Sequence, residues 1–298
     1  MAIIIHGVCF AMMQSLSGDP ALKIAAGRYG PDGLTSEIAQ SVKLELGLDR
    51  PIFEQYVGSL LFLLQFDLGY SLISGERIMD EIKIQLGYTL YLAIMAFVFS
   101  IVIAVPLGIY CGAKQNGFID QCSLLFSVFV RAIPPFVLGL LFILIFSVYF
   151  QILPPAGFED WTYFVLPAST LAFVLLAMSS RLIRNSMVEV SRTSYYHYGR
   201  HKGLSDFALI QRHGVKNTFI PIIAFFGLQA IFLIEGVVIV ESVFAFPGIG
   251  HALVHAVIAR DVPMIQGSVI IIGWLFIAIN FLADALARVL DKRLAFSV

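Results

Sequence analysis

The sequence predicts an all-α polytopic membrane protein, and three properties of the chain support this fold class. Hydrophobic residues make up 59% of the 298 residues and charged residues only 13%, whereas soluble domains carry about 25% charged residues. The mean hydropathy is +0.88. Several apolar runs approach the roughly 20 residues that a helix needs to cross a membrane. These properties exclude an ordinary water-soluble globule, and the net charge of −1 gives no electrostatic reason to expect a nucleic-acid partner.

Six transmembrane helices are predicted. Residues 1–16 form the first, which is short for a span. No basic residue precedes this stretch and no small-residue cleavage site follows it, so a removed signal peptide is not expected. The other five predicted spans are Tyr88–Tyr110, Leu124–Phe150, Phe164–Ser180, Thr218–Val240 and Gly267–Ala283. Residues 88–298 therefore make up the predicted transmembrane core.

Residues 17–87 form a polar stretch between the first two spans. They contain a turn signal at Gly30-Pro31-Asp32-Gly33 and an amphipathic pattern over Ser36–Leu46. This stretch is long enough for a small subdomain outside the membrane.

Basic residues in the short loops predict the orientation of the chain. The stretch Arg181–Asn217 carries seven basic and two acidic residues, which assigns it to the cytoplasm. The C-terminal Arg288, Lys292 and Arg293 agree with this assignment. An even number of spans then places both termini in the cytoplasm and residues 17–87 on the outer face.

The third span is interrupted by Ile133-Pro134-Pro135. Proline lacks a donor N–H and restricts the residue before it, so a helix must bend or break here. Two arrangements stay open. Either one kinked helix runs from about Cys122, or a cytoplasmic piece ends near Arg131 and the span begins after it.

No catalytic constellation is evident in the sequence. It contains no phosphate-binding G-x-x-x-x-G-K-[ST] loop and no H-E-x-x-H motif. Glu235 and Glu241 would project about 120° apart on a helix, so they do not form a catalytic pair, and Glu241 is predicted to be interfacial. His251 and His255 have the i, i+4 spacing of metal ligands, but no third ligand supports them and two interfacial histidines are the simpler interpretation.

Residues 185–217 contain the most informative loop. Within it a helix is predicted over Tyr195–Lys202, followed by Gly203 and by a second helix that Ser205 and Asp206 cap and that extends through His213. Two short helices joined by a glycine would form a basic, aromatic knob. Such a knob is either a solvated face or a docking surface for another protein.

The run GRHKGLSDFALIQRHGVKNTFIP at 199–221 resembles the cytoplasmic coupling loop of one family, the ABC importer inner-membrane permeases for dipeptides, oligopeptides and nickel. Further matching pieces occur in the same order along nearly the whole chain. They are SGDPA at 17–21, ELGLDRPIFEQY at 45–56, FDLGYSL at 66–72, LPPAGF at 153–158, RLIRNSMVEV at 181–190 and VESVFAFPGIGHALVHAVIARDVPMIQG at 240–267.

The resemblance implies a multi-pass permease subunit of the bacterial inner membrane. Its implied partners are a second, similar permease, two cytoplasmic ATP-binding subunits and an extracytoplasmic solute-binding protein. ATP and Mg would be bound by the ATPase partners, and the chain itself would be a transport subunit rather than an enzyme. The implied cargo is a short peptide, with nickel as the closest alternative.

The resemblance also implies a set of coupling residues. They are Arg200, Lys202, Gly203, Leu204, Arg212 and His213. Glu235 and Arg131 are predicted to line the translocation pathway, with a structural carboxylate at a subunit contact as the open alternative for Glu235. A gradient-driven secondary transporter or channel is the other functional class considered. It would not require a basic docking knob.

Overall fold

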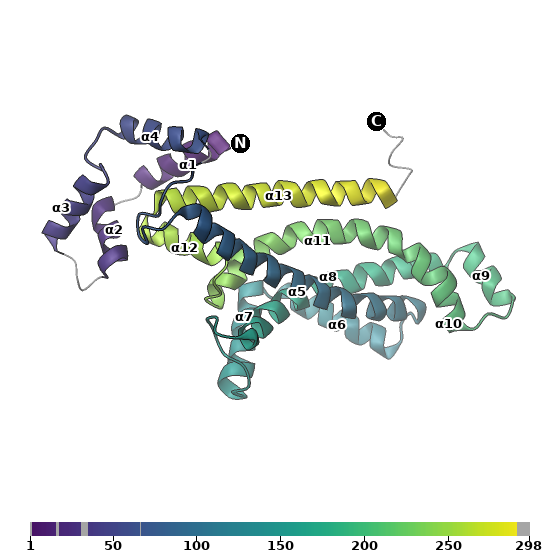
Figure 1. The fold of residues 1–298 in the computed structure, drawn as a ribbon. Helices are drawn as coiled ribbons and strands as arrows, with labels where there is room; N and C mark the ends of the chain where they lie inside the picture. The colour runs from purple at the N-terminus through teal and green to yellow at the C-terminus, as the bar shows by residue number, and fades with distance from the viewer. Residues whose placement is uncertain (1, 16–17, 31–34, 66, 291–298) are drawn as a thin grey trace. The chain divides into compact units, whose positions relative to one another are not determined.

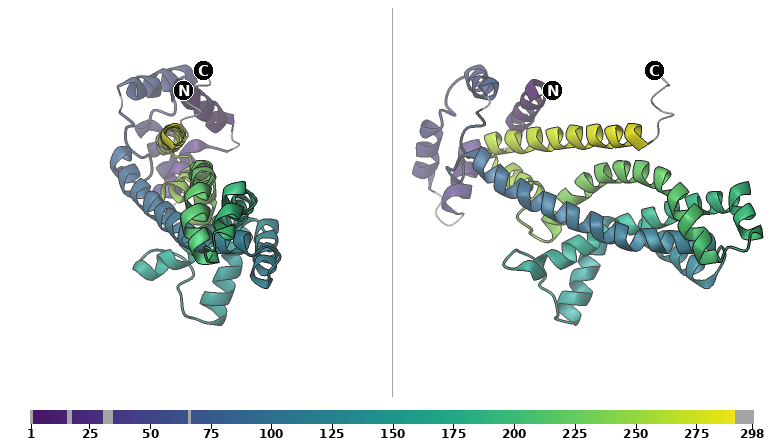
Figure 2. Two further views of the ribbon diagram at one scale, coloured as in Figure 1. Left: turned by 90° about the vertical axis from the view of Figure 1, so that its right-hand side faces the viewer. Right: turned by 45° about the vertical axis from the view of Figure 1, so that its right-hand side comes forward.

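The computed structural model describes residues 2–15, 18–30, 35–65 and 67–290. The predicted turn residues 31–33 and the basic Lys292 and Arg293 lie outside these ranges. The chain divides into two compact units, one with residues 1–89 and 247–275 and the other with residues 90–246 and 276–298. Both units consist of helices joined by turns (Figure 1 and Figure 2), which confirms the predicted all-α fold class.

The first unit is assembled mainly from short helices. They are α1 (Ala2–Ser15), α2 (Pro20–Tyr29), α3 (Ser36–Glu45), α4 (Ile52–Leu64) and α12 (Ile249–Ala259), with the N-terminal parts of α5 (Ile78–Ala113) and α13 (Val262–Leu290). The amphipathic helix predicted over Ser36–Leu46 is α3. Its N-cap Thr35 accepts a hydrogen bond from the Ile38 N–H, and its buried Val42 packs against Ile24 of α2.

The second unit is organised around one long helix, α8. Its helices are α6 (Phe118–Ala132), α7 (Pro135–Phe142), α8 (Val165–Ser191), α9 (Ser194–His201), α10 (Asp206–Leu209) and α11 (Lys216–Val243), with the remaining parts of α5 and α13. Helix α8 contacts α6, α7 and α11, and it lies alongside α11 in Figure 1.

Two of the sequence pieces that carry the family resemblance meet in the second unit. The Gly157 N–H of the LPPAGF piece donates a hydrogen bond to the Phe244 carbonyl at 2.8 Å. The Phe158 and Phe246 rings also pack edge to face, with centroids 5.7 Å apart. The Phe164 ring at the start of α8 contacts both. An aromatic cluster thus fixes the turn after α11 to the chain that leads into α8.

Four helical stretches in the described part of the chain are long and apolar enough to cross a membrane. They are Ile78–Ala113, Trp161–Ser191, Phe225–Val243 and Val262–Ala283. The pair Phe118–Ala132 and Pro135–Tyr149 makes a fifth if the two pieces count as one span. Helix α1 has 14 residues and is shorter than these. The total of six spans therefore stays a prediction.

The break in the third predicted span is sharp. Helix α6 ends at Ala132, Ile133 is extended, and α7 begins at Pro135. The two pieces are bent by 106°, far more than a proline kink inside one helix. This matches the arrangement in which a first piece ends near Arg131. A seven-residue π-helix, Ile143–Tyr149, then continues α7.

Helix α5 begins at Ile78, earlier than the predicted span start at Tyr88. The predicted span lies within α5, and the first turns of the helix fall outside the apolar run because they carry charged residues. Asp80 and Glu81 lie in the first turn, where negative charge is stabilised by the helix dipole and the free N–H groups. The apolar run predicts only the part of the helix that crosses the membrane, and α5 extends beyond this part at its N-terminal end.

Candidate functional site

The predicted coupling loop forms a compact projection that we call the knob, residues 194–215. It consists of α9, a turn at Gly203, α10 and a π-helical segment over Ile210–Val215 that leads into α11. In Figure 1 the knob lies at one end of the paired helices α8 and α11. The knob therefore connects the C-terminal end of α8 to the N-terminal end of α11.

Gly203 makes the turn between α9 and α10. Its φ is +82°, a left-handed conformation that residues with a Cβ rarely adopt. The Gly203 N–H donates to the Arg200 carbonyl at 3.0 Å, and the Leu204 N–H donates to the Gly199 carbonyl at 3.3 Å. These bonds close the C-terminus of α9. A Cβ at Gly203 would meet no atom within 4 Å, so the constraint at this position is conformational, not steric packing.

The second helix of the knob starts as predicted but does not stop at His213. Ser205 accepts a hydrogen bond from the Ala208 N–H and caps α10. The helix then passes through the π segment directly into α11. Side chains of the following turn make this possible, because Asn217 donates to the His213 carbonyl at 2.7 Å and Thr218 donates to the Gly214 carbonyl at 2.6 Å.

The interior of the knob is continuous with the helices beneath it. Tyr196 and Leu209 belong to the same buried hydrophobic cluster as Ile183 and Met187 of α8. Burial raises the pKa of Tyr196, with the nearby Asp206 as the next contribution, so its phenol stays neutral at physiological pH. A Cβ at Gly199 would lie 2.7 Å from the Leu209 Cδ2. The two helices of the knob are therefore packed closely against each other, and the shared hydrophobic cluster connects them to α8.

The outer surface of the knob is basic and aromatic. Arg200, Lys202, Gly203 and Arg212 are exposed, whereas Leu204 and His213 are partly buried. The structure thus gathers all six predicted coupling residues on one projection. Exposed aromatic side chains lie among them, with Tyr198 61% and Phe207 69% exposed.

Local contacts hold the charged groups of the knob only loosely. Arg200 and Asp206 form an ion pair at 3.3 Å in which both side chains are about two-thirds exposed. The Lys202 ammonium lies 4.7 Å from the centroid of the Tyr198 ring. Exposed pairs of this kind contribute about 0–1 kcal/mol. The basic groups therefore remain accessible to another protein.

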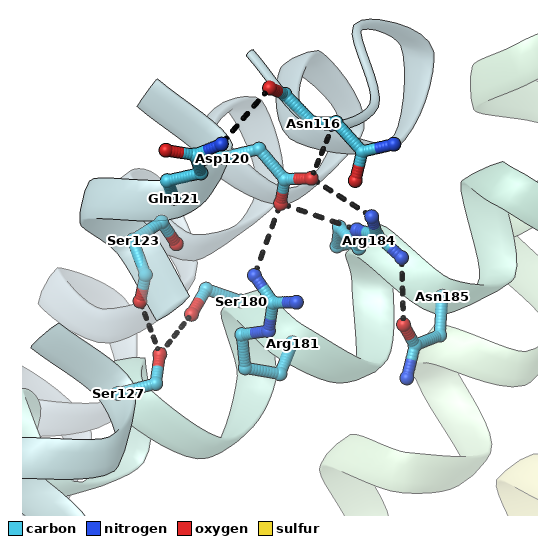
Figure 3. A network of polar contacts seen from close by, with 9 residues as sticks. All are labelled: Asn116, Asp120, Gln121, Ser123, Ser127, Ser180, Arg181, Arg184 and Asn185. Atoms are coloured by element: carbon cyan, nitrogen blue, oxygen red, sulfur yellow. Dashed lines mark hydrogen bonds and ion pairs between the residues drawn. The ribbon is translucent and has the colours of Figure 1, made fainter. Parts of the chain in front are cut away.

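A buried polar cluster joins α6 to the C-terminal half of α8, the helix that leads into the knob (Figure 3). The Asp120 carboxylate accepts hydrogen bonds from Arg184 Nη2 at 2.8 Å, Arg184 Nε at 3.2 Å and Arg181 Nη1 at 3.1 Å. It also accepts from the Asn116 N–H at 3.0 Å. The Asp120 side chain is 5% exposed. Charge-assisted, bidentate bonds of this kind are the strong class.

The two predicted pathway residues are both exposed on this single chain. Glu235 lies on the membrane-spanning part of α11, and Arg131 lies in the last turn of α6. Glu241 is fully buried within the chain, because it lies on the face of α11 that packs inside the unit, and its interfacial depth in the membrane stays a prediction. Glu235 and Glu241 thus occupy different faces of the helix, as their spacing predicts.

The histidine pair of α12 is close but has no third ligand in the described residues. The rings of His251 and His255 have centroids 4.4 Å apart. No group of three or more His, Cys, Asp or Glu side chains in the described ranges could hold a metal ion. Burial and the neighbouring His255 lower the pKa of His251.

Two structural features beneath the knob are not predicted by the sequence analysis. One is the Asp120 cluster, although Asp120 is the only acidic residue between Glu81 and Glu159, a signal that could have singled it out. The other is the contact of α5 with α8. The pattern Gly108-x-x-x-Gly112 lies in an apolar helix, and that pattern is typical of close helix packing in membranes.

Comparisons with known proteins agree with this architecture. The family model described as "Binding-protein-dependent transport system inner membrane component" matches residues 104–296. The glutathione transport system permease protein GsiC of Escherichia coli K12 is 33% identical over 293 residues, which cover 98% of this chain and 94% of GsiC. GsiC of Pectobacterium atrosepticum is 33% identical over 294 residues, covering 99% and 94%.

Solved structures show the same fold at lower identity. An inward-facing structure of the MetNI methionine ABC transporter matches with a TM-score of 0.61 and 16% identity, over 72% of this chain and 98% of that chain. An amino acid ABC transporter solved with histidines matches with a TM-score of 0.55, also at 16% identity, over 72% and 94%. The chain belongs to the family of binding-protein-dependent transport system inner membrane components and is the permease component of an ABC importer.

Proposed function

We propose that the knob docks onto a separate ATPase subunit and couples ATP hydrolysis to opening of the transport pathway. One observation carries this proposal. An exposed basic and aromatic surface sits on a core that continues into α8 and α11. Aromatic and arginine side chains are the typical anchors of protein interfaces. A force applied to the knob would therefore reach two long helices directly.

The partners proposed for the chain follow from its family. They are a second, similar permease, two ATP-binding subunits that hold ATP and Mg, and an extracytoplasmic solute-binding protein. The chain lacks a phosphate-binding loop in its sequence, so ATP hydrolysis is assigned to the partners. The seven basic residues over Arg181–Asn217 support a cytoplasmic knob. Residues 17–87 are accordingly proposed to form the extracytoplasmic subdomain, and both termini to lie in the cytoplasm.

The proposed cargo is a short peptide. Relatives that match nearly the whole chain are named glutathione transport system permeases, and nickel is the alternative cargo. Glu235 and Arg131 are proposed to line the pathway. A carboxylate in a membrane-spanning helix is costly against lipid, and Glu235 is exposed on this chain. Glu235→Gln should therefore alter the uptake of cationic cargo more than that of neutral cargo.

Gly203→Val tests the coupling role of the knob. Valine is β-branched and is strained at φ +82°, so the turn between α9 and α10 should change while the rest of the chain stays in the membrane. In the importer reconstituted with its ATPases and binding protein, we expect glutathione uptake to fall about tenfold or more and ATPase retention to weaken.

Gly75→Val is the matched control. Gly75 has φ +74° and also meets no atom within 4 Å of a Cβ, but it lies outside the knob. The substitution Gly75→Val imposes a similar backbone strain outside the knob, so uptake per assembled complex should stay close to wild type. Normal uptake with normal ATPase retention in Gly203→Val would refute the coupling role, as would equal losses in both variants.

A further inference from the structure

The part of α8 that leads into the knob is in close contact with two other helices, α5 and α6. Gly108 and Gly112 of α5 lie directly against it. A Cβ at Gly112 would be 2.6 Å from both the Arg184 carbonyl oxygen and the Met187 Cβ. A Cβ at Gly108 would be 2.8 Å from the Ser180 carbonyl oxygen. The two glycines therefore lie directly against the backbone of α8 and against the first side-chain atoms of Ile183 and Met187, and α5 has room for no Cβ at either position.

Helix α6 holds the same part of α8 through charge. Asp120, near the start of α6, binds both Arg181 and Arg184, which are three residues apart and so share a face of α8. Figure 3 shows the two guanidinium groups pointing toward the one carboxylate. The Asn116 N–H also binds this carboxylate, so Asp120 fixes the turn after α5 as well.

The balance of charge makes this cluster depend on Asp120. One carboxylate serves two guanidinium groups whose side chains are 18–19% exposed. Removing the carboxylate would leave two like charges next to each other in a largely dehydrated position, where pairing matters most. The electrostatic attraction between α6 and α8 at this position would then be lost. The repulsion between the two arginines of α8 would remain.

The same segment of α8, residues 180–187, is also in contact with the knob. Met187 lies in the hydrophobic cluster that contains Tyr196 and Leu209. A Cβ at Gly214 in the knob would lie 3.0 Å from the Met187 Cε. Movement of the knob would thus displace the segment of α8 that carries Arg184. The carbonyl of Arg184 lies against Gly112 of α5, and its guanidinium group binds Asp120 of α6.

We propose that Asp120 is a positioning residue for coupling: its carboxylate, shared by Arg181 and Arg184, makes α6 follow the movement of α8 and the knob. This proposal rests on the proposed function, since it requires that the knob transmits force from an ATPase. The Asp120 cluster determines whether this force reaches α6. Docking of the ATPase itself depends on the knob surface and not on Asp120.

The test measures the amount of ATP hydrolysed per glutathione transported by the complete importer in proteoliposomes. Asp120→Asn keeps the size of the side chain and removes its charge. We expect ATPase subunits to remain bound and the ratio of ATP to glutathione to rise about tenfold or more. A merely structural role would lower the yield of assembled complex but leave this ratio unchanged.

A charge exchange provides the decisive second variant. Asp120→Arg combined with Arg184→Glu again places one carboxylate beside two guanidinium groups, and it should bring the ratio back toward wild type. Asp80→Asn is the control, because Asp80 forms an exposed pair with Lys83 near the start of α5, with side chains 64% and 68% exposed. It should leave the ratio unchanged.

Other results would overturn the proposal. A wild-type ratio in assembled Asp120→Asn complexes would remove the coupling role, and a raised ratio that the exchange does not reverse would contradict the pairing. If Asp120→Asn does not assemble, the exchange variant must both assemble and transport with a near-normal ratio, or the proposal fails. Loss of ATPase binding by Gly203→Val is a separate readout that concerns the proposed function alone.

Discussion

The knob and the Asp120 cluster beneath it use similar charged side chains in opposite ways. In the knob, the Arg200–Asp206 pair is about two-thirds exposed, and its groups are separated by 3.3 Å. In the cluster, Asp120 is 5% exposed and receives bonds from two arginines and a backbone N–H. Exposed charges have little effect on the fold and remain accessible to a partner, whereas removing one partner of a buried ion pair leaves an uncompensated charge and is strongly destabilising.

The largest contrast should come from the same substitution in the two regions. Asp120→Asn should lower the free energy of unfolding by about 3 kcal/mol, the low end of the range for breaking a buried pair, because the arginines keep some exposure. Thermal or denaturant unfolding of the purified permease in detergent measures this loss. A change below about 0.5 kcal/mol would show that the cluster does not determine helix placement.

Asp206→Asn is the matching change in the knob and should have almost no effect on stability. Exposed ion pairs contribute about 0–1 kcal/mol, and the Asp206 side chain is 69% exposed. The same unfolding measurement applies. If Asp206→Asn proved as damaging as Asp120→Asn, the distinction between an accessible knob and a buried cluster would collapse.

Glycines on α5 should give the next largest effect. Gly112→Ala places a Cβ within 2.6 Å of the Arg184 carbonyl oxygen, and overpacking of this kind costs about 1–3 kcal/mol. Gly87→Ala is the control on the same helix, where a Cβ meets no atom within 4 Å. Replacing glycine by alanine in an open helical position stabilises by about 0.5–1 kcal/mol. The two changes in unfolding free energy should therefore have opposite signs, and equal signs would argue against close packing of α5 on α8.

His251 lies between the two extremes, since it is partly buried and its partner is another histidine. Burial and His255 lower its pKa below the ordinary value of about 6.5. The unfolded chain therefore binds a proton at a higher pH than the folded chain does. Stability should fall as the pH drops below about 6.5 and level off below the folded pKa.

His251→Gln should remove most of this pH dependence and leave stability near pH 8 little changed. Unfolding measured between pH 5 and pH 8 checks the prediction. A variant with the full pH dependence of the wild-type protein would assign the effect to another group. This effect should be the smallest of those that alter stability, because His251 retains contact with water.

Local features of the site could be predicted from the sequence, and the long-range ones could not. Gly203 and the capping Ser205 follow from rules that involve only a few neighbouring residues. The Asp120 cluster joins residues 61 and 64 positions apart, so it depends on how α6 packs against α8. Hydrophobic patterning locates the long apolar helices but does not specify their neighbours.

The ends of the helices also differ in how well the sequence predicts them. The predicted span starts at Tyr88, whereas α5 begins at Ile78, because the charged first turns of the helix lie outside the apolar run. The second knob helix was predicted to end at His213, but Asn217 and Thr218 provide side-chain bonds that carry it into α11. The proline break after Arg131 could be anticipated because proline acts on its immediate neighbours.

Photo-crosslinking at Tyr198 tests the central claim most directly. Benzoylphenylalanine replaces Tyr198, which is 61% exposed in the knob, or Tyr149, which is 79% exposed at the end of the π-helix after α7. Both sites accept a probe of similar size in the assembled importer. The coupling role of the knob predicts a crosslink from position 198 to an ATPase subunit and none from position 149. Crosslinking to the ATPase from position 149 alone, or from neither position in an importer that transports normally, would contradict it.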